Sequence, residues 1–119
     1  MKKIINAPEN YVDEMLEGIY AAHPDKVKCA ADALRCYCTA LFLGYVGDGL
    51  IDGCGVGGVF QSPSAEQIYN IATEVEAGAG VLFLYGNYTG DIMNFDMATE
   101  MLEMDDIEAK SIVGADDVL

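Results

Sequence analysis

Basic residues are scarce in this sequence, which has six lysines and arginines against 20 aspartates and glutamates and a net charge of −14. Proteins that bind nucleic acid neutralise phosphates with clustered lysines and arginines, so this shortage argues against nucleic acid as a partner. It argues equally against docking on anionic lipid. We interpret most of the acidity as a solubility device, although it would also steer a basic partner surface toward the chain.

Long hydrophobic runs are also missing. No apolar stretch approaches the roughly 20 residues that a membrane-spanning helix needs. The opening residues "MKKIINAPEN" contain two lysines but lack the apolar stretch of a signal peptide. We therefore expect a soluble cytoplasmic protein that makes no contact with a membrane.

Histidine occurs once, as His23, and no second histidine is available to form a spaced metal-binding pair. The cysteines lie at positions 29, 36, 38 and 54. Zinc sites favour a C-x2-C spacing or paired histidines, and neither is present. We expect no metal site, and we interpret the cysteines as reduced, buried thiols.

What the chain does contain indicates a single α/β domain over residues 1–119, with a hydrophobic content of 52%. Helices are predicted over residues 9–22, from the cap at Ser64 to Gly78, and over Asp91–Glu103. Short apolar runs predict buried strands over Val81–Tyr85 and Ala109–Val113. A strand, a helix and a strand joined by short links predict a small, mostly parallel sheet with helices packed on it.

Two segments are harder to interpret. Residues 27–43 fit either a helix or a short strand, and both interpretations stay open. Residues 44–60 hold seven of the 13 glycines, and Gly53, Gly55 and Gly58 match the G-x-G-x-x-G pattern. No helix is predicted directly after that pattern, so tight turns and close backbone approach explain it better than a dinucleotide site does.

The segment between the predicted strand and the helix after it combines small and polar residues. Gly86 and Gly90 allow the backbone to approach a ligand closely, and Asn87, Thr89 and Asp91 supply donors and acceptors. Ligands of parallel sheets bind beyond the carboxyl ends of the strands, where this segment lies. An aspartate there can accept a hydroxyl proton during phosphoryl transfer. A turn followed by a helix cap at Asp91 explains the same residues without chemistry.

Four blocks of the chain are "MKKIINAPENYVDEMLEGIYAAHPD", "GYVGDGLIDGCGVGGVFQSPSAEQI", "NYTGDIMNF" and "GADDVL". In this order they resemble the N-terminal part of the DhaK-type, substrate-binding subunit of dihydroxyacetone (glycerone) kinases. The resemblance implies phosphoryl transfer to dihydroxyacetone in glycerol and glycerone metabolism. It implies no cofactor in this chain, since a nucleotide-binding partner subunit carries ATP or a phosphorylated carrier. The family's subunit is dimeric, so a homodimer is a further hypothesis.

The resemblance also assigns roles to residues. Asp91 corresponds to the family's acid or base and contacts a substrate hydroxyl, and Gly86, Asn87 and Thr89 would surround the substrate. Cys38 stands where the family has a substrate-site histidine within a glycine-rich loop.

The chain departs from the family where that loop should be. None of the eight residues "ALRCYCTA" at positions 33–40 matches the glycine-rich loop. By the same resemblance, residues 27–43 look shorter than in the family, and we expect the chain to end in mid-domain. We therefore expect a truncated domain that is inactive alone, for which a frameshift is one explanation. Two hypotheses stay open: a kinase subunit, and a non-catalytic regulatory or binding relative of the same fold.

Overall fold

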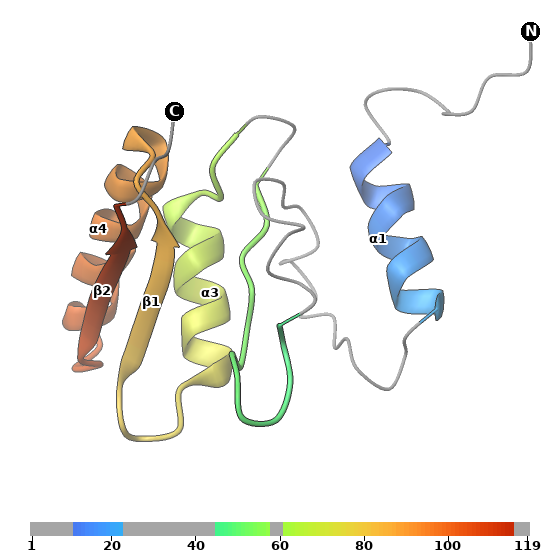
Figure 1. Cartoon of the computed structure of the whole chain (residues 1–119). Coiled ribbons are helices and arrows are strands. Elements are labelled where there is room, and N and C mark those ends of the chain that lie inside the picture. Colours follow the sequence, from blue (N-terminus) through green and yellow to red (C-terminus); the bar gives the residue numbers. More distant parts are fainter. Residues whose placement is uncertain (1–10, 23–44, 58–60, 116–119) are drawn as a thin grey trace, which may run out of the picture.

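The computed structural model describes residues 11–22, 45–57 and 61–115. In chain order these ranges contain α1 (Tyr11–Ala22), α3 (Ala65–Val75), β1 (Val81–Gly86), α4 (Thr89–Met104) and β2 (Ala109–Gly114). Figure 1 shows β1 and β2 side by side with α3 and α4 close to them, while α1 stands apart from this group. No helix within the described ranges is long and apolar enough to cross a membrane. The ambiguous residues 27–43, which include Cys38, lie outside these ranges.

The two strands pair in parallel, with Val81 opposite Ala109 and Gly86 opposite Gly114. Helix α4 connects them, so the predicted strand–helix–strand unit is confirmed, as is the α/β class. Both strands continue one residue beyond their predicted ends, to glycines that pair with each other.

Helix α3 begins as its sequence predicts. The hydroxyl oxygen of Ser64 accepts from the Gln67 amide at 3.2 Å, and Gln67 Oε1 accepts from the Ser64 amide at 3.0 Å. The predicted end at Gly78 is wrong, because the helix ends at Val75 and Glu76 adopts an extended conformation. The Glu76 carboxylate then accepts from the amides of Gly78 and Gly80, which holds the turn before β1.

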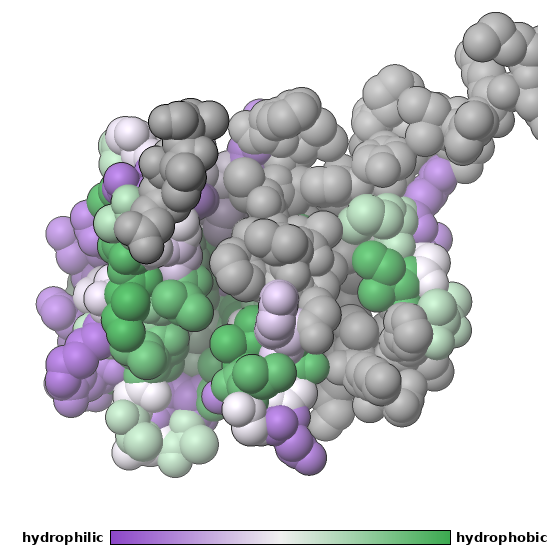
Figure 2. All heavy atoms as spheres, viewed as in Figure 1, coloured by the Kyte–Doolittle hydropathy of each residue, from purple (hydrophilic) through white to green (hydrophobic). Residues whose placement is uncertain are grey.

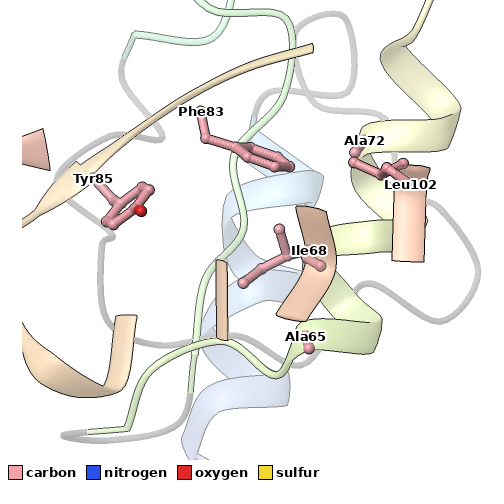
Figure 3. Close-up of a cluster of buried hydrophobic side chains, with 7 residues drawn as sticks. Ala65, Ile68, Ala72, Phe83, Tyr85 and Leu102 are labelled. Atoms are coloured by element: carbon pink, nitrogen blue, oxygen red, sulfur yellow. The ribbon is translucent and has the colours of Figure 1, made fainter. Parts of the chain in front are cut away.

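The core lies between β1 and the two helices that cover one face of the sheet. Its buried members are Ala65, Ile68, Ala72, Phe83, Tyr85, Ala98 and Leu102. Figure 3 shows Ile68 of α3 and Phe83 of β1 turned into this space from opposite sides. Ala98 and Leu102 lie four residues apart on α4 and are fully enclosed, as expected for the inward face of a helix.

The opposite face of the sheet is open. Leu82, Leu84 and Ile112 are 63%, 55% and 53% exposed, so β1 is not the buried strand that its apolar run predicts. Figure 2 shows these strands as a hydrophobic surface beside the hydrophilic atoms of α4. Because side chains alternate across a strand, only the odd-numbered half of β1 reaches the helices.

Candidate functional site

A cavity of about 450 Å³ borders β1, α3 and the glycine-rich residues 50–55. This volume lies within the range of small-molecule pockets, about 300–1,000 Å³. The walls are mostly apolar side chains and backbone, and the lining side chains that can ionise are Asp52, Cys54, Tyr85 and Asp91. The wall includes Gly80 through Gly86, so the cavity follows the whole of β1.

Glycine allows the wall formed by residues 50–55 to pack against α3. A Cβ atom on Gly53 would lie 2.9 Å from Ile71 Cγ2 and 3.0 Å from Val75 Cγ1. A larger residue would push this segment away from the helix and widen the cavity. The close approach is the role predicted for these glycines, and Gly58, the last member of the pattern, lies outside the described residues.

The chain bends sharply where β1 ends. The Asn87 amide donates to the Gly114 carbonyl at 3.1 Å and the Tyr88 amide donates to the Gly86 carbonyl at 2.8 Å. These bonds close the end of the sheet and start α4 at Thr89, two residues before the predicted start. The helix cap is Tyr88, which makes no side-chain cap bond, so the alternative interpretation of Asp91 as the cap is wrong.

Asp91 is the third residue of α4 and lies in the cavity wall. Its Oδ1 atom is shielded from solvent and has no hydrogen-bond partner among the described residues. A buried acceptor without a donor is costly, so this oxygen favours an arriving N–H or O–H group. Its place in the first turn of a helix suits a carboxylate, because the helix amides there are positively polarised.

The structure places only some of the site residues predicted from the sequence in the cavity wall. Gly86 and Asp91 line the cavity, at the carboxyl end of β1. Asn87 and Thr89 are exposed and are not part of its wall. Cys38 lies outside the described residues, so its proximity to Asp91 stays a prediction.

Sequence reasoning missed Ser62. Its hydroxyl oxygen is buried and, like Asp91 Oδ1, has no hydrogen-bond partner among the described residues. A Cβ atom on Gly90 would lie 2.8 Å from this oxygen, so Gly90 is what allows Ser62 to approach the first turn of α4. The Asn94 side-chain amide fixes the same contact by donating to the Pro63 carbonyl at 2.7 Å.

Two further side chains shape the cavity. Phe95 stacks on Tyr85 with ring centroids 4.0 Å apart and lies in the wall near Asp91. Cys54 lines the opposite wall, where burial raises the pKa of its thiol from 9.0 to about 11. A thiol with so high a pKa stays protonated at neutral pH and is a poor nucleophile. Within the described ranges, no three His, Cys, Asp or Glu side chains cluster as metal ligands would.

A parallel strand–helix–strand unit with a carboxylate at the carboxyl end of β1 defines an α/β protein with a candidate small-ligand site. The pattern of the Dak1 domain matches residues 39–119, which is most of the chain. The chain therefore belongs to the Dak1 domain family.

Curated relatives agree with this assignment. The dihydroxyacetone-binding subunit DhaK of the PTS-dependent dihydroxyacetone kinase of Lactococcus lactis is 36% identical over 98% of this chain. The corresponding subunit of the PEP-dependent kinase of Escherichia coli is 38% identical over 99%. A D-erythrulose kinase of Mycolicibacterium smegmatis is 35% identical over 99%, with 23% of its own length covered.

The chain spans about two fifths of the length of the DhaK relatives, 41% for Lactococcus lactis and 38% for Escherichia coli. The alignment with the Lactococcus lactis protein extends over 135 residues, 16 more than the 119 of this chain. That relative therefore carries at least 16 residues within the aligned region that this chain lacks. The difference agrees with the shorter segment expected from the sequence, although it does not locate the missing residues.

The fold also matches a crystal structure. The dihydroxyacetone kinase from C. freundii, in complex with AMP-PNP and Mg²⁺, superposes with a TM-score of 0.80 over 98% of this chain and 26% of its own. At 22% sequence identity, this likeness shows the fold alone.

Proposed function

We propose that this chain is a dihydroxyacetone-binding component of a dihydroxyacetone kinase, and that Asp91 holds a hydroxyl group of the substrate. The observation that carries the proposal is Asp91 Oδ1, a buried acceptor in the wall of the cavity that lacks a partner among the described residues. The relatives named as dihydroxyacetone-binding subunits support the choice of ligand.

The chemistry follows from the carboxylate. A substrate hydroxyl donates its hydrogen bond to Asp91, which orients the hydroxyl oxygen and increases its electron density. As that oxygen forms its bond to phosphorus, the proton passes to Asp91, and the donor's bridging oxygen leaves with the electron pair. Gly86 lets the ligand approach the backbone beside this carboxylate. The phosphoryl donor belongs to a partner subunit, as ATP or as a carrier charged from phosphoenolpyruvate.

We further propose that the chain binds the ketone without phosphorylating it when alone. By the resemblance, Cys38 stands at the position of the family's histidine, and a thiol does not offer imidazole's combination of charge and donor geometry. A non-catalytic binding relative is therefore the second candidate function. It is favoured by the at least 16 residues that the Lactococcus lactis relative has and this chain lacks.

Calorimetric titration of the full chain with dihydroxyacetone tests binding. We expect saturable binding that Asp91→Asn weakens by about tenfold or more, since loss of a hydrogen bond to a charged group costs about 1.5–3 kcal/mol. Asp96→Asn is the matched control, because Asp96 belongs to the same helix, is exposed and is absent from the cavity wall. Titration with erythrulose asks whether the site also takes a four-carbon ketose.

A coupled assay with a nucleotide-binding kinase subunit and ATP, and separately with a phosphoenolpyruvate-driven carrier, tests turnover. Product would establish the kinase role, whereas binding without product would establish the non-catalytic relative. An unaltered heat signal with Asp91→Asn, or no binding by the unmodified chain, would overturn the proposed role of the carboxylate.

A further inference from the structure

The hydrogen bonds between β1 and β2 involve the backbone N–H and C=O groups of only every second residue of β1. The Val81 amide donates to the Glu108 carbonyl at 2.8 Å, and the Asn87 amide donates to the Gly114 carbonyl at 3.1 Å. In a parallel pair, the N–H and C=O of one residue point to the same edge, and successive residues alternate between edges. The odd-numbered residues of β1 therefore pair with β2.

The even-numbered residues direct their backbone groups to the other edge. The N–H and C=O of Leu82 and Leu84 point away from β2 and meet no hydrogen-bonding partner among the described residues. Unpaired backbone groups along a strand edge act as a template for pairing with another strand. The free edge of β1 thus has both the donors and the acceptors for one further strand.

The cavity lies along this same edge. Gly80 through Gly86 form one wall, residues 50–55 form the other, and the apolar side chains of α3 form the floor. The floor residues are Ile68, Ile71, Ala72 and Val75. We name this region the β1 slot.

Electrostatics limits what could occupy the β1 slot. Lys110 is the only basic side chain within the described ranges, and it pairs with Glu108 at 2.7 Å. Asp52 and Asp91 lie in the walls of the slot. An acidic segment would therefore be repelled, while positive charge at the ends of an apolar segment would be attracted.

We propose that the β1 slot binds an extended apolar segment of another polypeptide, flanked by basic residues, as a strand added to the free edge of β1. Main-chain hydrogen bonds to Leu82 and Leu84 provide the affinity, as in other complexes formed by strand addition. Small apolar side chains of the added strand rest on the α3 floor, and its basic ends meet the acidic surface. The slot is the cavity whose wall includes Asp91, so the added strand and dihydroxyacetone would bind in the same cavity.

A fluorescent synthetic peptide, Lys-Lys-Val-Ala-Val-Ala-Val-Ala-Lys-Lys, provides the probe. We expect its anisotropy to rise as the full chain is added, and its affinity to fall as salt is increased. A version with proline in place of the third valine keeps the charge but cannot pair as a continuous strand. A version with glutamate at the four flanking positions tests the charge. We expect at least about fivefold weaker binding from each.

Leu84 supplies a discriminating variant. Its amide points into the slot and its side chain is 55% exposed, so Leu84→Pro removes a slot donor without removing a bond to β2. Leu84→Ala is the matched control, because it shortens the same side chain and keeps the amide. We expect Leu84→Pro to weaken peptide binding by about fivefold and Leu84→Ala to leave it within about twofold. Circular dichroism establishes that both variants retain the fold.

The outcomes separate the alternatives. Equal binding of the proline peptide, or no effect of Leu84→Pro in a folded chain, would overturn strand addition. If no peptide binds and the chain sediments as a dimer that Leu84→Pro dissociates, the occupant is a second copy and the proposal is wrong. If no peptide binds to a monomeric chain, the slot is closed to other polypeptides and the proposal is again wrong. None of these results depends on dihydroxyacetone.

Discussion

Gly80 stands immediately before β1, and replacing it with alanine should destabilise the domain through two separable effects. Its φ of +85° lies in the left-handed region, which glycine adopts freely and alanine does not. A Cβ atom at this position would also lie 2.5 Å from the carbonyl oxygen of Glu108. That carbonyl accepts the first hydrogen bond of the β1–β2 ladder, from Val81 at 2.8 Å. Relief of the clash must therefore disturb the start of the sheet.

Gly78 separates the two effects, because its φ is +91° and an added Cβ would meet nothing within 4 Å. Gly78→Ala should lower the free energy of unfolding by about 1–2 kcal/mol, because alanine is strained at this positive φ. Gly80→Ala should lower the free energy of unfolding by the same amount, and by about 1 kcal/mol more because the hydrogen bond from Val81 to Glu108 is weakened. The difference corresponds to a melting temperature lower by about 4–8 °C for Gly80→Ala than for Gly78→Ala.

Urea denaturation followed by far-ultraviolet circular dichroism measures both free energies of unfolding. Hydrogen exchange of the Val81 amide gives an independent reading, and it should accelerate in Gly80→Ala but not in Gly78→Ala. Equal destabilisation by the two substitutions, with unchanged protection of Val81, would refute the close approach of Gly80 to Glu108 and with it the start of the ladder.

Three other substitutions test the remaining structure. Leu102→Ala, at the largest fully buried side chain of the described residues, should reduce the free energy of unfolding by about 2–5 kcal/mol. Met104→Ala, at a residue 77% exposed, should change it by less than about 0.5 kcal/mol. Asp106 has a φ of +59° at the end of α4, so Asp106→Gly should raise the melting temperature and Asp106→Ala should not. With the other three cysteines replaced by serine, the rate at which Cys54 is alkylated should rise with an apparent pKa near 11, because burial raises its pKa from 9.0 to about 11. The folded state then holds the proton more tightly than the unfolded state, so this contribution to stability is present below pH 9 and is lost between pH 9 and 11.

The parts of the fold that the sequence predicts are those determined by neighbours along the chain. Ser64 and Gln67 are three residues apart, and that spacing alone is sufficient for the reciprocal cap that starts α3. The inward positions Ala98 and Leu102 follow from helical periodicity. The strand–helix–strand order likewise leaves little choice for the pairing of β1 with β2.

The features that sequence reasoning missed depend on contacts between distant segments. Ser62 reaches the first turn of α4 only because Gly90 leaves room for its hydroxyl. Neither residue type indicates such a contact in a sequence. The start of α4 was also placed too late, since Thr89 and Gly90 are weak helix formers. Their helical conformation follows the bend whose amides bond to Gly86 and Gly114.

The exposure of β1 shows a different limit. An uninterrupted apolar run such as Val81–Tyr85 is typical of a parallel strand covered on both faces. The helices cover only Phe83 and Tyr85, while Leu82 and Leu84 stay exposed. The apolar run is typical of a strand covered on both faces, but the described residues cover β1 on one face only. The same exposed strand borders the β1 slot, so the open face and the free edge both indicate that β1 has room for further contacts.

Net charge distinguishes the two ways in which that apolar surface could be covered. Two copies of this chain each carry a net charge of −14, so their association is opposed by repulsion that salt screens. A basic segment is attracted by the same charge, and salt weakens that attraction. Raising the salt concentration from 50 to 500 mM should therefore strengthen any self-association in sedimentation experiments while weakening binding of the lysine-flanked peptide. If both responses had the same sign, charge would not govern what binds β1, and the basic character proposed for its partner would have to be abandoned.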